Sequence, residues 1–277
     1  MKFTKMQGCG NDYVYINCFE EKVDDMPNMA RLVSNRNFGV GSDGLICILP
    51  SEKADFKMQM YNMDGSYSPM CGNGIRCVAK YVYDKGLTAK TEITIETGGM
   101  IKTLELNIEN DLVKSVKVDM GTPELRPQFI PIAEQGRSFI ERSVIVDGKE
   151  IFLTAVNMGN PHAVIFVPDA DAADVKGLGP KIENHPLFPE KTNVEFVEVI
   201  DRETLKMRDW ERGSGETLAC GTGASASLVA AVLTGRAKEQ AMVKLLGGEL
   251  FIQWDREENS LYMTGPAVTV FDGELYL

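Results

Sequence analysis

Met70-Cys71-Gly72-Asn73-Gly74 and Ala219-Cys220-Gly221-Thr222-Gly223 are two versions of one short motif. Cys220 follows Cys71 by 149 residues, and the same offset carried downstream without a gap places Gly223 on Gly74. The repetition predicts two half-molecules that each contribute one cysteine. If the halves face each other across a cleft, two thiols can approach one carbon from opposite sides, which is the geometry that inverts a stereocentre.

Each motif stands at the start of a predicted helix, over residues 74–84 and 222–234. Gly86 and Gly235 follow the ends of these helices, where glycine is a typical stop signal. The second helix is apolar on nearly every side, so we expect it to be buried inside its own half.

Strand patterns dominate the remainder of both halves. Residues 91–97, 101–108 and 112–118 alternate polar and apolar side chains, with a hairpin turn at 109–111. In the second half, the strand-like segments are 151–157, 163–167, 194–200 and 250–254. We therefore expect an α+β fold with two pseudo-symmetric domains, each a strand-rich sheet or barrel wrapped around a central helix, with the active site in the cleft between them.

The boundary between these domains is expected at 119–123, where a strand gives way to Met-Gly-Thr-Pro. This predicts an N-terminal domain of residues 1–119, completed by 266–277, and a C-terminal domain of residues 120–265. The length of 277 residues, with 44% hydrophobic and 25% charged residues, suits two modest globular domains.

The net charge of the chain limits the kinds of molecule that it is expected to bind. A net charge of −11 and a pI of about 4.8 argue against a surface for nucleic acid or anionic membrane, because both need clustered Lys and Arg. No segment approaches the roughly 18 consecutive apolar residues of a membrane span. We expect a small-molecule partner, with no nucleic acid and no membrane.

The cysteine content indicates a reducing compartment. Six cysteines in a chain of this size are too few for a disulfide scaffold, and the first residues lack the apolar segment of a secretion signal. The cytoplasm is therefore expected. A structural zinc site is not expected, because Cys71 and Cys77 are six residues apart and the chain has only two histidines. The glycine-rich motifs also lack the residues that complete a P-loop or a dinucleotide fingerprint.

Cysteine at a helix N-terminus is suited to proton transfer. The helix dipole favours the thiolate there and lowers the thiol pKa, so that the cysteine can act as a base. Glycine neighbours let the backbone approach a ligand closely. We expect the N–H groups that follow each cysteine, those of Gly72, Asn73, Gly221 and Thr222, to converge on an anion such as a substrate carboxylate.

Further segments, taken together with the two cysteine motifs, make the chain resemble the diaminopimelate epimerase family from end to end. The segments that carry the resemblance, besides 70–77, are Lys5-Met6-Gln7-Gly8-Cys9-Gly10-Asn11-Asp12-Tyr13, Gly41-Ser42-Asp43-Gly44, Asn62-Met63-Asp64-Gly65-Ser66, Gly159-Asn160-Pro161-His162, Asn193-Val194-Glu195-Phe196 and residues 210–224. The departures from the family pattern, at Gln7, Ser68-Pro69 and Ser225, do not touch the two cysteines.

The resemblance implies the interconversion of LL- and meso-diaminopimelate at one α-carbon, in the biosynthesis of lysine and peptidoglycan precursors. Catalysis is by Cys71 and Cys220, one as thiolate base and the other as thiol acid, without pyridoxal phosphate, any other cofactor or a metal. The direction of reaction decides which cysteine is the base. A homodimer is also implied.

The resemblance further assigns roles to other side chains. His162 and Glu211 tune the proton affinities of the two thiols. Substrate binding falls to Gly72, Asn73, Gly221 and Thr222 around the reacting carboxylate, and to Asn11, Asn62, Asn160, Asn193, Glu211 and Arg212 at the distal ammonium and carboxylate. An arginine fork and asparagine carbonyls suit those two groups chemically.

Two other functions are compatible with the motifs. A related two-cysteine racemase of proline, hydroxyproline or histidine would keep both cysteines but would not need Arg212 together with several asparagines. A non-catalytic amino-acid binding protein with two lobes would need only the anion sites. The retained polar set favours diaminopimelate.

Overall fold

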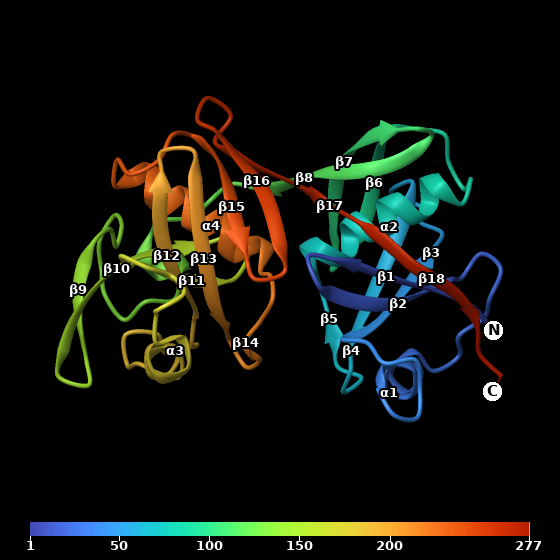
Figure 1. The fold of residues 1–277 in the computed structure, drawn as a ribbon, viewed down its shortest axis with the longest axis horizontal. Helices are drawn as coiled ribbons and strands as arrows, with labels where there is room; N and C mark the ends of the chain where they lie inside the picture. The colour runs from blue at the N-terminus through green and yellow to red at the C-terminus, as the bar shows by residue number, and fades with distance from the viewer. Residues whose placement is uncertain (277) are drawn as a thin grey trace. The chain divides into compact units, whose positions relative to one another are not determined.

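The computed structural model describes residues 1–276, and the chain divides into two compact units. One unit consists of Met1–Asp119 and the chain from Thr264 on, and the other of Met120–Met263. Figure 1 shows how the last strand, β18 (Val268–Glu274), lies beside the N-terminal strand β1 (Lys2–Gly8), with which it pairs antiparallel. The two ends of the chain are thereby joined in the first unit.

The first unit is a curved sheet with one helix inside it. Its strands follow the order β18–β1–β2–β3–β4–β6–β7–β8, in which β2–β3 and β4–β6 are parallel and the other pairs antiparallel. The bounds are β2 Asn11–Asn17, β3 Gly44–Leu49, β4 Phe56–Asn62, β6 Glu92–Thr97, β7 Met100–Glu109 and β8 Leu112–Gly121, and the short β5 (Tyr67–Ser68) pairs with β4.

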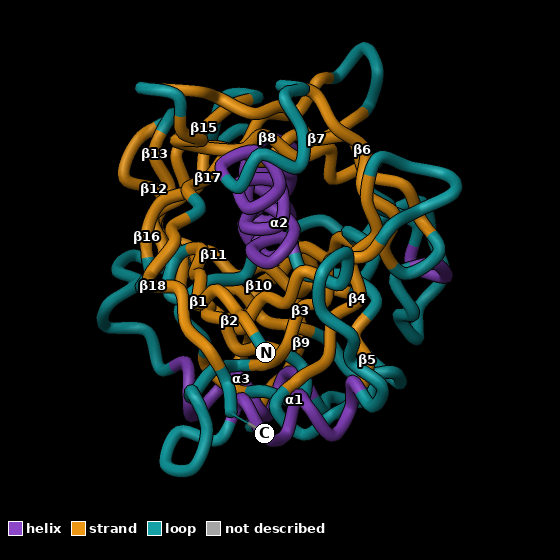
Figure 2. Tube along the Cα trace, turned by 90° about the vertical axis from the view of Figure 1, so that its right-hand side faces the viewer, coloured by secondary structure: helices purple, strands orange, loops and turns teal. Residues whose placement is uncertain are grey.

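Helix α2 (Gly72–Asp84) lies within this sheet. It contacts the neighbouring strands β18, β1 and β2 and also β7, farther along the sheet, and Figure 2 shows strands on either side of it. Helix α1 (Met26–Ser34) instead packs on β2, β3 and β4. The expected helix and the three expected strands of this half are confirmed, including the turn between β7 and β8.

The second unit repeats the same pattern of strand pairing. Its strands follow the order β9–β10–β11–β12–β13–β15–β16, with β11–β12 and β13–β15 parallel. The bounds are β9 Arg142–Val146, β10 Lys149–Asn157, β11 Pro161–Phe166, β12 Asn193–Asp201, β13 Thr204–Glu211, β14 Gly215–Glu216, β15 Gln240–Leu245, β16 Gly248–Asp255 and β17 Ser260–Pro266. A 3-10 turn, Pro127–Phe129, precedes β9.

Helix α4 (Gly221–Leu233) is the core of the second unit. It contacts β10, β11, β12, β13, β15 and β16, and most of its residues are buried. Its sequence of Ala, Val, Leu and Ser leaves no polar face for solvent, so burial on all sides is the stable arrangement. The prediction of a buried, all-round apolar helix is therefore confirmed. Helix α3 (Val175–Glu183) packs on β9, β12, β13 and β14.

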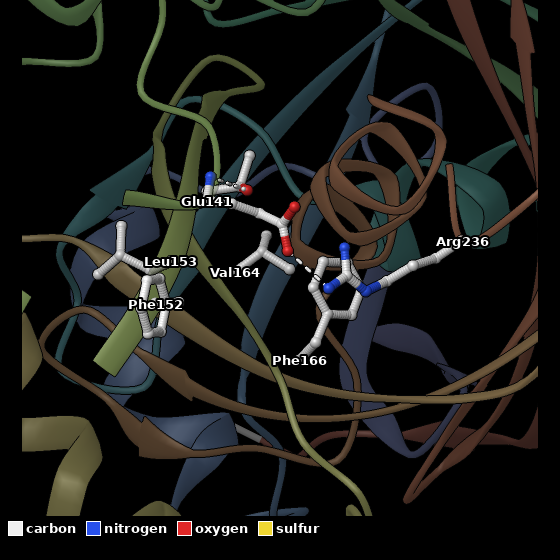
Figure 3. Close-up of a pocket in the computed structure, with 7 residues that line it drawn as sticks. Glu141, Phe152, Leu153, Val164, Phe166 and Arg236 are labelled. Atoms are coloured by element: carbon white, nitrogen blue, oxygen red, sulfur yellow. Dashed lines mark hydrogen bonds and ion pairs between the residues drawn. The ribbon is translucent and has the colours of Figure 1, made fainter. Parts of the chain in front are cut away.

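A cavity of about 260 Å³ opens in the second unit, away from the predicted site residues. Its lining includes Glu141, Phe152 and Arg236 (Figure 3). Arg236 pairs with Glu141 and stacks over the Phe166 ring, 4.4 Å from its centroid. The polar groups of this cavity therefore already satisfy one another.

Candidate active site

The two motif cysteines cap the two central helices. Cys71 is the N-cap residue of α2, and its Sγ accepts a hydrogen bond from Gly74 N–H at 3.3 Å. Cys220 is the N-cap residue of α4 and accepts from Gly223 N–H, also at 3.3 Å. Both cysteines have extended backbone angles, as N-cap residues do. The repeated sequence therefore produces the same local structure twice.

The third residue after each cap must be small, but for different reasons. A Cβ at Gly223 would lie 2.9 Å from Glu195 Oε1 and 3.3 Å from Cys220 Sγ. A Cβ at Gly74 would meet the terminal methyl of Ile46 at 2.6 Å and Cys71 Sγ at 3.6 Å. The absent side chain of Gly223 thus leaves the space in which a carboxylate and a thiol approach each other.

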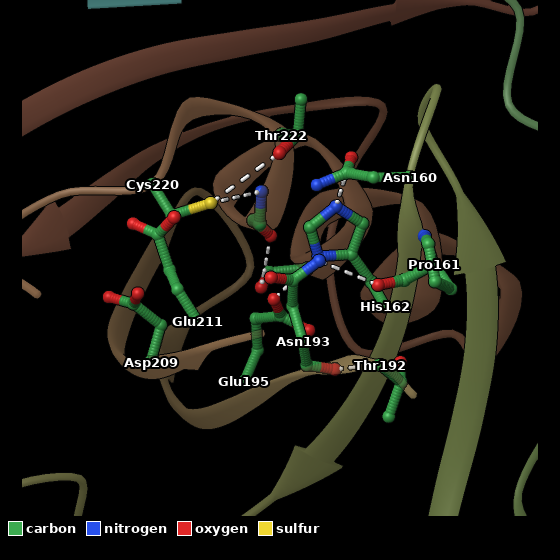
Figure 4. A network of polar contacts seen from close by, with 12 residues as sticks. Asn160, Pro161, His162, Thr192, Asn193, Glu195, Asp209, Glu211, Cys220 and Thr222 are labelled. Atoms are coloured by element: carbon green, nitrogen blue, oxygen red, sulfur yellow. Dashed lines mark hydrogen bonds and ion pairs between the residues drawn. The ribbon is translucent and has the colours of Figure 1, made fainter. Parts of the chain in front are cut away.

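His162 and Glu195 form a buried pair in the second unit (Figure 4). Nδ1 of His162 lies 2.6 Å from Glu195 Oε1, and Nε2 lies 2.9 Å from Asn160 Oδ1. Both side chains are fully buried. Each ring nitrogen therefore faces a side-chain oxygen, the Glu195 carboxylate on one side and the Asn160 amide on the other.

Carboxylates surround the Cys220 thiol. Burial raises the pKa of Cys220 well above its ordinary value, and the negative charges of Glu211, Asp209 and Glu195 raise it further. The hydrogen bond with Thr222, at 3.4 Å, acts in the opposite direction. The direction of this shift is opposite to the lowering that a helix N-terminus favours. With its pKa raised by burial and like charge, Cys220 is a thiol that can donate a proton.

Asp209 and Glu211 are linked through one hydroxyl. Thr217 Oγ1 lies 2.9 Å from Asp209 Oδ2 and 2.7 Å from Glu211 Oε1. Burial, with Glu211 nearby, also raises the pKa of Asp209 well above its ordinary value. The ligand atoms of Asp209, Glu211 and Cys220 lie within 4.8 Å of one another, so these side chains are close enough to share a cation. A thiol at Cys220 does not favour one.

Asn193 and Arg212 meet at the ends of two strands. The Asn193 side chain is buried, donates to Pro161 O at 2.8 Å and accepts from Arg212 N–H at 2.9 Å. The exposed Arg212 guanidinium donates to Glu190 O at 3.0 Å. Asn193 therefore fixes the backbone on which Arg212 stands.

In the first unit, Asn11 lies directly beside Cys71. Cys71 Sγ donates to Asn11 Oδ1 at 3.3 Å, while Asn11 Nδ2 donates to Asp43 Oδ2 at 2.9 Å. Tyr13, on the same strand, is buried close to Asn11 and Cys71. Burial raises the pKa of Tyr13 well above its ordinary value, and the charge of Cys71 adds to that effect. Tyr13 thus remains a neutral hydroxyl.

The remaining predicted residues of the first unit have different surroundings. Asn73 is buried, and its Oδ1 accepts from Arg76 Nη2 at 2.9 Å. Arg76 is itself buried and also donates to Gly72 O at 3.1 Å, which fixes the first turn of α2. The half-buried Asn62 donates to Ser66 Oγ at 3.0 Å, and its strand places it opposite Gly44.

The second unit thus brings together five of the predicted residues, His162, Asn160, Glu211, Cys220 and Thr222. In the first unit, the predicted residue whose side chain contacts Cys71 is Asn11. Two acidic members of the network, Glu195 and Asp209, are absent from the residues predicted from sequence. The 149-residue offset could have revealed them, because it aligns Glu195 with Ile46 and Asp209 with Met60. An acid in one copy of a repeat, opposite an apolar residue in the other, indicates a specialised position.

Comparison with known proteins gives a consistent result over the whole chain. The family model described as diaminopimelate epimerase matches residues 3–126 and 154–270. A diaminopimelate epimerase of Acetivibrio thermocellus is 58% identical over 277 residues, covering 100% of this chain and 99% of the relative. One from Methanococcus maripaludis is 54% identical over 275 residues, covering 99% of each.

Solved structures with low sequence identity share the fold. A PhzF-family phenazine biosynthesis protein of Bacillus anthracis has a TM-score of 0.71 at 15% identity and covers 100% of this chain and 99% of its own. A hydroxyproline epimerase from Agrobacterium vitis has a TM-score of 0.69 at 15% identity, covering 99% of this chain and 91% of its own. These likenesses confirm the expected α+β class. Within residues 1–276, none of the helices has the length and apolarity that crossing a membrane requires.

Proposed function

Because the chain belongs to the diaminopimelate epimerase family, we propose that it interconverts LL- and meso-diaminopimelate by proton transfer between the substrate α-carbon and two cysteines. The observation that carries this proposal is the full-length identity of 58% to a diaminopimelate epimerase, together with a cysteine cap on each of two equivalent helices. The product serves lysine and peptidoglycan precursor biosynthesis.

In the proposed reaction, the thiolate of one cysteine removes the α-hydrogen as a proton and becomes a thiol. The electron pair stays on the α-carbon, which the adjacent carboxylate stabilises. The thiol of the other cysteine then delivers its proton to the opposite face and becomes a thiolate. Atoms and charge balance without a cofactor, and the two cysteines end with exchanged protonation states.

Backbone amides supply the electrostatic stabilisation in this scheme. Those of Gly72, Asn73, Gly221 and Thr222 belong to the first turns of α2 and α4, where amides have no partner within the helix. We assign them to the carboxylate of the reacting centre, since a helix N-terminus favours an anion. The arrangement is preorganised because each cap cysteine is fixed by its own helix.

Recognition of the distal end is assigned to Asn11, Asn62, Asn160, Asn193, Glu211 and Arg212. The exposed Arg212 guanidinium suits the distal carboxylate, and carbonyl or carboxylate oxygens suit the distal ammonium. His162 and Glu211 set the proton affinity of the thiols in this proposal. For Glu211 the supporting observation is its contribution to the raised pKa of Cys220.

The decisive experiment is solvent exchange. Reduced protein without added cofactor is incubated in D₂O with LL-diaminopimelate, and separately with proline, hydroxyproline and histidine. We expect deuterium at the α-carbon of diaminopimelate alone. Absence of exchange with every amino acid would overturn the enzymatic proposal, and exchange into proline or histidine instead would establish a related racemase.

Substitution of each cysteine tests the two-base scheme. Cys71→Ala and Cys220→Ala are each expected to lose epimerisation, with Cys18→Ala as a control on a cysteine at the end of β2. Normal turnover by either catalytic variant would contradict the scheme.

We also propose that the protein works in the cytoplasm as a homodimer. The family suggests the dimer, and the sparse cysteine content suits a reducing compartment. Sedimentation equilibrium is expected to give about twice the chain mass of 30.6 kDa, and cell fractionation to recover the protein with cytoplasmic markers. A monomer, or recovery outside the cytoplasm, would contradict these assignments.

A further inference from the structure

One hydroxyl in the second unit lies between two carboxylates of strand β13. Thr217 Oγ1 is 2.7 Å from Glu211 Oε1 and 2.9 Å from Asp209 Oδ2, and it is the donor to both oxygens. Asp209 is 2% exposed, whereas Glu211 and Thr217 are half-buried. The hydroxyl therefore joins the half-buried carboxylate to the buried one.

The hairpin of β13 and β14 brings these three side chains together. Successive side chains of a strand point to opposite faces, so Asp209 and Glu211, two residues apart on β13, share one face. Trp210 pairs with Glu216 across the hairpin, and the same register carried one residue further sets Thr217 opposite Asp209. Strand β12 pairs with the other edge of β13. The sheet thus determines where the Thr217 hydroxyl lies.

The bridged carboxylates lie next to the cysteine that caps α4. The ligand atoms of Asp209, Glu211 and Cys220 are within 4.8 Å of one another. Burial is the largest cause of the raised Cys220 pKa, and the charges of Glu211, Asp209 and Glu195 follow it, while the hydrogen bond with Thr222 acts in the opposite direction. Because the interaction of two charges falls with distance, the place of the Glu211 carboxylate affects the proton affinity of this thiol.

The first unit contains the same hairpin without the acids. The offset of 149 residues aligns Thr217 with Ser68 and Asp209 with Met60. Met60 and Ser68 pair across β4 and β5, but Met60 offers no carboxylate, and Ser68 Oγ donates to Met70 O at 3.4 Å. The hairpin by itself therefore does not require a hydroxyl that bridges two acids.

We propose that Thr217 is a positioning residue whose hydroxyl holds the Glu211 carboxylate beside the Cys220 thiol. Without this shared donor, repulsion between the two carboxylates would turn the half-buried Glu211 side chain toward solvent. Thr217 itself transfers no proton. The inference rests on the proposed function in giving Glu211 its part in thiol tuning and substrate binding, but the place of Glu211 is measurable without turnover.

The first test measures the reactivity of Cys220 without substrate. Thr217→Val removes the hydroxyl and keeps the shape of the side chain, while Thr217→Ser keeps the hydroxyl. Each folded variant is alkylated with iodoacetamide over a range of pH. The extent of reaction is measured by mass spectrometry on the tryptic peptide 213–236, in which Cys220 is the only cysteine. The matched control is Thr234→Val near the other end of α4, because the Thr234 hydroxyl donates to Ala230 O at 2.8 Å.

Removal of the hydroxyl should lower the pH midpoint of Cys220 alkylation. In Thr217→Val the displaced Glu211 carboxylate raises the thiol pKa less strongly, so we expect the midpoint to fall below that of wild type. Thr217→Ser and Thr234→Val should match wild type. A midpoint in folded Thr217→Val that equals or exceeds that of wild type would overturn the proposal.

A double variant separates positioning of Glu211 from a general loosening around the thiol, which would also lower the midpoint. Thr217→Val is introduced into Glu211→Gln, and the same alkylation series is repeated. If Thr217 acts through the Glu211 charge, we expect the second substitution to lower the midpoint no further. A further fall as large as the one that Thr217→Val causes alone would assign the effect to loosening and refute the positioning role.

Turnover supplies the second readout. We expect kcat/KM for LL-diaminopimelate to fall by about tenfold in Thr217→Val, the scale of a lost hydrogen bond to a charged group, and to recover in Thr217→Ser. Wild-type turnover by Thr217→Val would overturn the proposed role. If the unaltered protein does not epimerise diaminopimelate, the proposed function fails, while the alkylation series still decides whether Thr217 positions Glu211.

Discussion

Nδ1 of His162 lies 2.6 Å from Oε1 of Glu195, and neither side chain reaches solvent. The second carboxylate oxygen, Oε2, is buried and has no hydrogen-bond partner among residues 1–276. The pair is thus held together mainly by one short contact. A buried charge loses much more when its partner is removed than the intact pair contributes.

Replacement of Glu195 removes the carboxylate that faces His162 and should therefore destabilise the folded protein. We expect Glu195→Gln to lower the free energy of unfolding by about 1–3 kcal/mol, as measured by urea denaturation. Glu198→Gln, on the same strand but only partly buried, is the control. A double-mutant cycle with His162→Asn should show coupling between the two positions, and strictly additive effects would contradict the pairing.

Gly74 and Gly223, each three residues after an N-cap cysteine, should respond differently to the same change. Gly223→Ala places a methyl group against Glu195 Oε1 and Cys220 Sγ, so we expect a loss of turnover of at least about tenfold, the effect of a misplaced reacting group. Gly74→Ala meets only the end of the Ile46 side chain within 3.0 Å and should retain most activity. Equal losses in both variants would show that the Glu195 contact is unimportant.

The stability of the protein should depend on the ionisation of Asp209. Since the folded-state pKa of Asp209 is raised, its contribution to stability is full below the ordinary value of 3.8 and is lost as the pH rises through the raised pKa. Asp209→Asn cannot ionise. We expect the melting temperature of Asp209→Asn, relative to that of wild type, to increase as the pH rises from about 4 to about 8.

The control for this series is Asp111→Asn, in the exposed turn between β7 and β8. Circular dichroism melts of both variants at each pH give the comparison. A difference between Asp209→Asn and wild type that stays constant across the series would refute the linkage.

The same substitution should make Cys220 more reactive. Asp209 is one of the negative charges that raise the Cys220 pKa, so Asp209→Asn is expected to lower the pH midpoint of Cys220 alkylation. Glu216→Gln is the control, because Glu216 is paired with Arg208. Unaltered Cys220 reactivity in Asp209→Asn would show that the nearby carboxylates do not govern the thiol.

Chelation provides a further check on the reaction chemistry. The proposed mechanism needs no cation, so dialysis against EDTA should leave turnover unchanged. The assay is α-deuterium exchange before and after chelation, and again after Zn²⁺ is restored. Loss of activity on chelation with recovery on Zn²⁺ would assign a catalytic cation to Asp209, Glu211 and Cys220, and would contradict the scheme.

The fold was predictable because its signals are local and repeated. The two Cys-Gly-x-Gly segments gave both helix starts, since capping depends on residues within one turn. The apolar sequence of α4 predicted that the helix is buried, and the alternation of polar and apolar residues predicted strands such as β7 and β8. The parallel pairings β2–β3 and β11–β12 were not predictable in this way, because they join residues that are far apart in the chain.

The sequence by itself determined that two cysteines stand at equivalent helix N-termini, because the motif and the first turn it caps are contiguous. Only the tertiary structure decided which groups surround each thiol. Cys220 is surrounded by Glu195, Asp209 and Glu211 from two different strands, while Cys71 has Asn11 and Tyr13 beside it. Proton affinity depends on burial and on charges brought together across strands, which a contiguous motif does not encode.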